Sequence, residues 1–299
     1  MGLGLVGTTQ RGTALMAGLA MFLMLQVWAG QALAADGAPL DLSYELTLGG
    51  ITVMSFEFDV RTSAGRYAVD FSGRTRGVLN LLGSGYVVSS AQGVVRPDGT
   101  PEPQSFVSHS DGNEGEKRTQ IEYDAQGPAR WTALPAPGSD GEPLTPIPDG
   151  SIPGTRDILT ALYDFAGELG RNESCAHDMR IFDGRRRFDL KFSDRGTDRL
   201  EPEGDGFYAG PALHCHLDLA RIGGYSTDPA KRVSGDDAEF WLAPVLPGEP
   251  PLPVEIVFKG RLGMMHARLI QAVHGTDRKG SIDPKPQSAA VTPNIDNPR

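Results

Sequence analysis

The chain has 299 residues and a formal net charge of −10, from 38 acidic and 28 basic residues. An acidic balance of this size argues against a nucleic-acid-binding protein and against attraction to anionic lipid by overall charge alone. A chain of this length can bury a sizeable core without a metal or many disulfides.

Residues 1–34 have the pattern of a secretory signal. Arg11 supplies a positive N-terminal region, residues 14–28 form a largely apolar run, and an Ala-Leu-Ala site ends at Ala34. The alternative is an uncleaved anchor, but the run is shorter than the roughly 18 residues that a spanning helix needs. We therefore expect cleavage after Ala34, no transmembrane span in the mature chain, and a periplasmic location.

Alternating apolar residues dominate the chain from Leu42 onwards. Two such runs flank Gly49-Gly50, which predicts a two-residue hairpin turn. Short strands joined by close turns are typical of a meandering antiparallel sheet or barrel. The predicted strands before residue 135 are 42–48, 54–60, 67–71, 86–96, 104–109, 118–124 and 130–134.

A loop and one helix interrupt this pattern. Residues 134–154 are rich in proline and glycine and show no period, so they predict a loop, either a crossover or a lid. A helix follows, with Thr155 as its cap, Asp157 in its first turn and Gly170 at its end. Its expected apolar face consists of Ile158, Leu162, Phe165 and Leu169.

The strand pattern resumes after the helix and stops near residue 273. The predicted strands are 178–183, 188–192, 212–222, 238–243, 252–259 and 261–273. Residues 274–299 are polar and aperiodic, which predicts a disordered tail. The expected fold is mainly β: a single domain over residues 35–273, built as a large antiparallel open barrel or β-spiral-like sheet with one packed α-helix.

Cys175 and Cys215 are expected to form a disulfide in an oxidising compartment. The alternative is a metal or reactive-thiol site that includes His214 and His216. Adjacent strand residues point to opposite faces, so Cys215 cannot converge with both histidines. No further ligands occur at zinc spacing, and we expect no metal and no cofactor.

Three polar clusters are candidates for chemistry. Residues 111–115 resemble the start of a calcium loop but lack its later ligands, and they also fit a hairpin tip. Arg185 and Arg187, separated by a third arginine, are candidate anion ligands or solvated turn residues. The acidic group at 236–239 would suit acid–base chemistry or a turn before a strand. No recognised catalytic motif occurs, so we assign no catalytic residue.

Several stretches resemble one exported bacterial family, domain-of-unknown-function 3108. They are YELTLGGITV, DILTAL, MRIFDGRRRFDL and the closing FWL and PLPVEIVFKGRLGMMHARL segments. The likeness covers roughly Leu42 to Ala272. The resemblance implies an envelope-associated β-protein with one packed helix. It supplies no catalytic residues.

Two classes of function remain open from the sequence. The first is a non-enzymatic periplasmic protein that supports envelope integrity and binds a lipid, another hydrophobic ligand or an envelope partner. Its candidate ligand contacts are Ile158, Leu162, Phe165, Arg185 and Arg187. The second is a hydrolase that acts on the envelope or cell wall through acidic residues. A purely structural scaffold is the third option, and the sequence does not indicate the oligomeric state.

Overall fold

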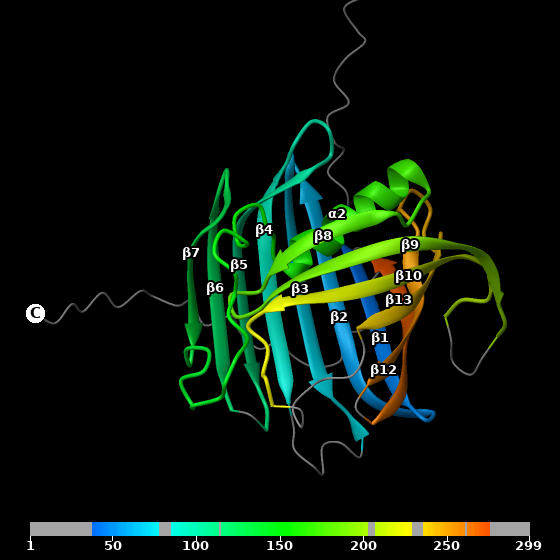
Figure 1. The fold of residues 1–299 in the computed structure, drawn as a ribbon. Coiled ribbons are helices and arrows are strands. Elements are labelled where there is room, and N and C mark those ends of the chain that lie inside the picture. The colour runs from blue at the N-terminus through cyan, green and yellow to red at the C-terminus, as the bar shows by residue number, and fades with distance from the viewer. Residues whose placement is uncertain are drawn as a thin grey trace, which may run out of the picture.

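One continuous antiparallel sheet forms the body of the protein in the computed structural model (Figure 1). The structure describes residues 38–77, 85–113, 115–202, 207–228, 236–260 and 262–275. The predicted signal and almost all of the predicted tail lie outside these residues. The first seven strands are β1 (Leu40–Leu48), β2 (Ile51–Ser63), β3 (Arg66–Thr75), β4 (Tyr86–Val95), β5 (Pro101–Asp111), β6 (Lys117–Asp124) and β7 (Gly127–Leu134).

The helix and six more strands complete the described chain. They are α2 (Ile158–Asn172), β8 (His177–Phe182), β9 (Arg187–Leu200), β10 (Gly210–Gly223), β11 (Asp237–Ala243), β12 (Leu252–Gly260) and β13 (Gly263–His274). The spatial order is β7-β6-β5-β4-β3-β2-β1-β13-β12-β11-β10-β9-β8, so only the β1–β13 pair joins strands distant in sequence. The mainly antiparallel β-fold with one helix is thus confirmed.

The sheet curls until β8–β10 lie across β3–β5, with α2 enclosed between these two layers (Figure 1). One side of the helix packs Ala161, Phe165 and Leu169 against β8–β11. Its other side packs Leu159 into a cluster with residues of β3–β6. The helix is therefore an internal plug of the barrel, because apolar residues on two sides must both leave water.

The two edge strands, β7 and β8, do not pair with each other. Residues 154–156 and several side chains connect them instead. Arg156 makes a parallel bridge to β8, and Gly154 donates a backbone hydrogen bond of 2.7 Å to Gln126. The ring of Trp131 meets that of Phe182 edge-on at 5.1 Å. These contacts connect the two edges, although β7 and β8 do not pair and the sheet is not closed by a hydrogen-bonded ladder.

The predicted ends of the helix were wrong. Asp157, and not Thr155, is the N-cap, because its carboxylate accepts the backbone N–H of Thr160 at 2.8 Å. The helix continues past Gly170 to Asn172, where Glu173 turns into the left-handed region and donates its N–H to Leu169. A helix end can be capped by any residue whose side chain or backbone reaches the exposed N–H or C=O groups. Capping preferences of residue types alone therefore misplaced both ends of this helix.

The predicted apolar face of the helix was only partly correct. Phe165 and Leu169 are buried, whereas Ile158 and Leu162 are half-buried. The buried set also contains Leu159, Thr160 and Asp164, which a single apolar stripe does not include. A helix enclosed by sheet on two sides needs a wider buried surface than a helix resting on one layer.

Candidate functional site

An open cleft of about 610 Å³ lies at the C-terminal end of α2. Its walls are the last turns of the helix, Thr197 of β9, the start of β10, and the end of β11 with the loop that leads to β12. Most of the lining is small or apolar: Ala166, Gly167, Leu169, Gly170, Pro211, Ala212, Leu213, Leu242, Pro244, Gly248, Pro250 and Pro251. The volume is in the range of small-molecule sites in proteins.

Proline and glycine shape this cleft. The β11–β12 loop contains Pro244, Pro250 and Pro251, whose fixed backbone angles give one wall a preformed shape. Gly170 allows the loop to approach the helix, since a Cβ atom there would come within 3.1 Å of Pro250 Cβ. The shape of the loop wall thus follows from the local sequence, and its position against the helix follows from the fold.

The rim of the cleft is negatively polarised. Among the described residues, Glu173 and Glu249 are the ionisable residues that line it, and the C-terminal end of α2 carries the negative end of the helix dipole. Arg171 in the last turn lies beside Gly167 and pairs with Glu168 at 2.7 Å. Glu249 lies 3.8 Å from Nδ1 of His274. An apolar ligand with a neutral or cationic head group would suit these surroundings better than an anion.

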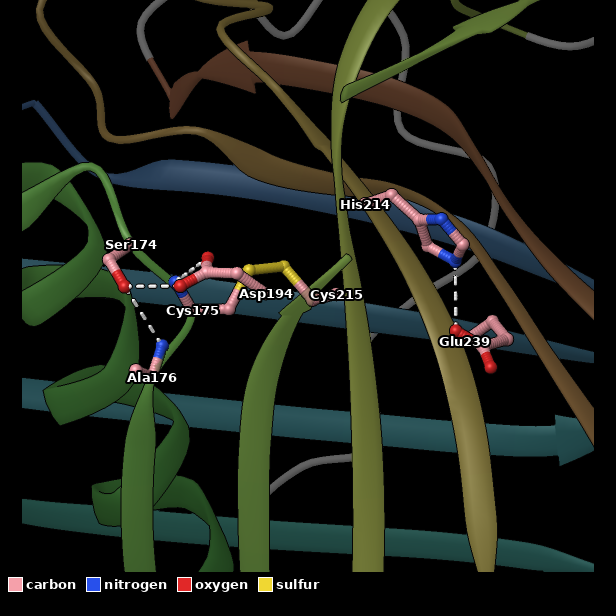
Figure 2. Close-up of a disulfide and its surroundings, with 7 residues drawn as sticks. All are labelled: Ser174, Cys175, Ala176, Asp194, His214, Cys215 and Glu239. Atoms are coloured by element: carbon pink, nitrogen blue, oxygen red, sulfur yellow. Dashed lines mark hydrogen bonds and ion pairs between the residues drawn. A yellow bond between two sulfur atoms is a disulfide. The ribbon is translucent and has the colours of Figure 1, made fainter. Parts of the chain in front are cut away.

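The disulfide between Cys175 and Cys215 holds two walls of the cleft together (Figure 2). Each cysteine follows a lining residue by two positions, Glu173 and Leu213, and the two Cα atoms are 5.9 Å apart. Both cysteines are fully buried. Asp194 fixes the same segment by accepting the N–H of Cys175 at 2.8 Å.

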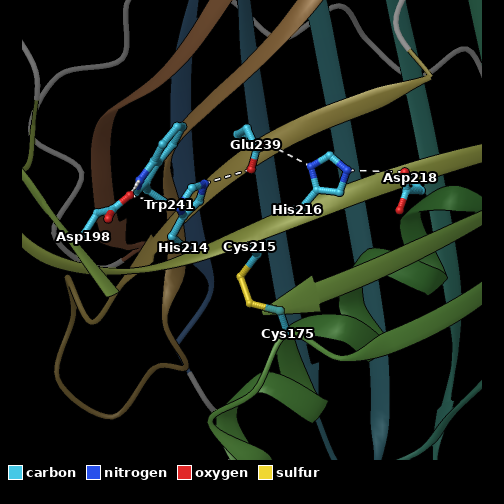
Figure 3. Close-up of polar contacts among 8 residues, drawn as sticks. All are labelled: Cys175, Asp198, His214, Cys215, His216, Asp218, Glu239 and Trp241. Atoms are coloured by element: carbon cyan, nitrogen blue, oxygen red, sulfur yellow. Dashed lines mark hydrogen bonds and ion pairs between the residues drawn. A yellow bond between two sulfur atoms is a disulfide. The ribbon is translucent and has the colours of Figure 1, made fainter. Parts of the chain in front are cut away.

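A histidine–carboxylate cluster lies on β10, on the face opposite to Cys215 (Figure 3). Glu239 on β11 contacts both histidines of β10, at 2.8 Å from His214 Nε2 and 2.7 Å from His216 Nδ1. The ring of His214 also stacks on Trp241 at 4.7 Å. As the alternation of a strand requires, Cys215 points away from both histidines.

This cluster has the character of a cross-strand surface network. His216 and Glu239 are register neighbours, and Asp198 and Asp218 extend the chain of contacts to β9 and along β10. None of these residues lines the cleft. Within the described residues, no group of three or more His, Cys, Asp or Glu side chains is arranged to hold a metal ion.

The family of the chain follows from comparison with known proteins. The model of the family described as protein of unknown function (DUF3108) matches residues 43–263, which is more than half of the chain. The chain belongs to the DUF3108 family. No curated protein matches it.

One solved structure that resembles this DUF3108 protein is a β-barrel-like protein of domain of unknown function DUF1849 from Brucella abortus. The identity is 10%, the TM-score is 0.44, and the match covers 80% of this chain and 98% of the other. Within the part of this DUF3108 protein that the structure describes, no helix is long and apolar enough to cross a membrane.

The five candidate ligand contacts of the sequence do not come together in this DUF3108 protein, and none of them lines the cleft. Ile158 and Phe165 pack in the core, where the ring of Phe165 stacks on Phe192 at 4.2 Å. Leu162 lies on a half-buried side of the helix.

The two candidate arginines have structural partners. Arg185 bridges the sheet edges by donating to the carbonyl oxygens of Leu134 and Pro135 at 2.8 and 2.9 Å. Arg187 is 3% exposed and donates to Ser151 O at 2.9 Å and to Asp189 at 2.5 Å. Gly184 in the preceding turn has φ +86°, and a Cβ there would lie 2.3 Å from Thr119, so the turn requires glycine.

The remaining polar candidates lie on turns or strand ends. Asp111 ends β5 at the hairpin that leads to β6, and Gly115 lies beyond it in the same hairpin. Asp236 pairs with Arg221 at 2.6 Å, and Asp237 begins β11. These acidic residues therefore do not form a shared catalytic pair with Glu239, which contacts the histidines.

Sequence reasoning did not identify the cleft. Its lining comes from four separate segments with ordinary small and apolar residues, which carry no recognisable spacing. One signal was available: residues 244–253 contain five prolines and separate two predicted strands. A rigid loop of this kind indicates a shaped surface, although only the fold shows that the helix end faces it.

Proposed function

We propose that this DUF3108 protein is an exported, non-catalytic protein of the bacterial envelope that binds an amphipathic hydrophobic ligand in the cleft at the end of α2. The observation that carries the proposal is the preformed, largely apolar cleft of about 610 Å³. An apolar chain buried there contributes about 0.8 kcal/mol per methylene. The core of the barrel is filled by the helix, so the ligand occupies the end of the barrel and not its centre.

The proposed location in the periplasm is supported by two features. Residues 1–34 have the three-part pattern of a secretory signal. The buried disulfide is of the kind that persists in oxidising compartments. Cleavage after Ala34 would release a chain that carries the cleft.

The proposed ligand has a neutral or cationic head group. Glu173 and Glu249 supply the charges of the cleft rim, and the helix C-terminus adds the same sign. A fatty acid anion would meet repulsion from both carboxylates. The hydrolase alternative receives less support, since the histidine–carboxylate cluster lies outside the cleft.

Displacement of the fluorescent probe N-phenyl-1-naphthylamine tests the proposal with three matched ligands: dodecylamine, dodecanol and dodecanoate. For residues 35–299, we expect dodecylamine and dodecanol to displace the probe, and dodecanoate to bind at least about fivefold more weakly than dodecylamine. Replacing both Glu173 and Glu249 by glutamine should remove the difference between the amine and the acid.

The location of binding is tested by filling the cleft. Ala166→Trp places a large side chain in the cleft and should weaken dodecylamine binding at least about tenfold, because it occupies the space of several methylenes. Thr132→Trp, on the exposed strand β7, is the matched control and should bind as the unmodified chain does. Equal binding by both variants would contradict the proposal, and absence of binding by every protein would favour a structural scaffold.

A further inference from the structure

Two neighbouring hairpin tips form one end of the barrel. The β1–β2 tip and the β12–β13 tip lie side by side because β1 pairs with β13, with Leu48 opposite Met265. A Cβ atom on Gly263 would lie 3.4 Å from Leu48, so the two tips are in contact. The cleft is at the opposite end, since β12 begins beside it at Leu252 and ends at the tip.

The two tips expose large apolar side chains. Leu262 is 66% exposed, Ile51 is 54% exposed and Met264 is 50% exposed. They continue outward from a buried cluster that contains Leu46 and Val53. Three exposed aliphatic side chains on adjacent turns are more than the isolated apolar residues of an ordinary surface.

The charge around the tips is opposite to that of the whole chain. Arg74, Arg76 and Lys259 are exposed at this end. Arg74 is on β3, and the backbone N–H of Arg76 bonds to the carbonyl of Val53 just behind the tip. No acidic residue occurs in 46–54, 73–77, 257–260 or 262–265, although the chain as a whole carries −10. Glu45, just before the first range, is half-buried and accepts a hydrogen bond from Thr52 at 3.1 Å. The exposed charges in these ranges are therefore basic.

We propose that these tips dock the protein on an anionic lipid bilayer. Leu262, Ile51 and Met264 would enter the boundary between head groups and acyl chains, while the three basic side chains would remain at the level of the lipid phosphates. The basic side chains of Arg74, Arg76 and Lys259 favour a lipid bilayer over an apolar protein surface, because such a surface would offer no partner for their charges. The protein would then stand with its cleft facing away from the membrane, about 30 Å from the tips along β12.

Sedimentation with lipid vesicles tests this docking on residues 35–299. We expect binding to vesicles of phosphatidylglycerol and phosphatidylethanolamine, and weaker binding to phosphatidylcholine vesicles or at high salt. The double variant Ile51→Ser/Leu262→Ser should reduce partitioning at least about tenfold. Replacing Lys259 and Arg74 by glutamine should reduce it further on anionic vesicles only, by about fivefold for each residue.

The matched control replaces two exposed apolar residues elsewhere on the barrel, Val107→Ser and Ile270→Ser. It should bind vesicles as the unmodified chain does. No binding to anionic vesicles, or an equal loss in the tip and control variants, would overturn the proposal. The cleft-filling Ala166→Trp variant should keep its vesicle binding. Vesicle sedimentation therefore tests the docking proposal, and displacement of the fluorescent probe tests the ligand site.

Discussion

Replacing both Cys175 and Cys215 by alanine should lower the free energy of unfolding by about 4 kcal/mol, which corresponds to a fall in melting temperature of about 10 °C. The bond closes a loop with a sequence separation of 40 residues, and its loss releases conformational entropy in the unfolded chain. Alanine is the suitable substitute because both side chains are fully buried in the core cluster around Phe165. Thermal unfolding followed by circular dichroism measures the change.

The single variants serve as controls for the loss of the disulfide. Cys175→Ala and Cys215→Ala each break the bond while keeping one native side chain, so each should lose nearly as much stability as the double variant. A melting temperature within about 2 °C of the unmodified chain would contradict the assigned role. We also expect weaker dodecylamine binding by the double variant, because the disulfide joins the segments that contain Glu173 and Leu213.

Replacing Asp157 by alanine should lower the free energy of unfolding by about 3–5 kcal/mol. Asp157 is fully buried and accepts hydrogen bonds from the backbone and hydroxyl of Thr160 at 2.8 and 2.7 Å and from Tyr123 at 3.1 Å. Thr160 in turn shares a hydrogen bond with Tyr67 of β3 at 2.8 Å. Alanine would remove the helix cap and leave the hydroxyl groups of buried Thr160 and half-buried Tyr123 without this acceptor.

Asp157→Asn is the control, and it should lose less stability than Asp157→Ala, because its amide oxygen keeps the cap to the N–H of Thr160. Its amide nitrogen takes the place of the oxygen that accepts the hydroxyls of Thr160 and Tyr123, so part of the loss remains. Burial raises the pKa of Asp157, against the hydrogen bonds from Thr160 and Tyr123 that lower it. The folded state therefore binds the proton more tightly than the unfolded state does. The stability of the unmodified chain relative to Asp157→Asn should fall as the pH rises from about 4 towards the folded pKa. An opposite slope in urea unfolding would contradict the raised pKa.

Most of the strands could be predicted from the sequence because each carries its own period of two. The pattern from Leu42 to Leu48 and the turn at Gly49-Gly50 are local features, and the structure has β1 and β2 at these positions. The pairing of β1 with β13 is not local: Leu40 lies opposite His274, more than two hundred residues away. The alternation of apolar residues does not identify such a distant partner. The sequence therefore predicts an open barrel or a spiral-like sheet without deciding between them.

The buried surface of the helix was harder to predict for a related reason. A period of 3.6 identifies one apolar face, whereas an internal helix also buries polar residues that find partners in other strands. Thr160 and Asp157 are buried because Tyr67 and Tyr123 reach them from β3 and β6. The cleft depends on the same long-range placement, since it exists only where the end of α2 meets the loop before β12.

The most direct test of a ligand site at the end of an internal helix is photolabelling with a dodecylamine that carries a diazirine on its chain. After irradiation, peptide mass spectrometry locates the labelled residues. We expect saturable labels within residues 166–173, 211–213 and 242–251, and their loss in Ala166→Trp. Labels concentrated between α2 and β3–β6, or only labels that excess unlabelled dodecylamine does not suppress, would contradict this account.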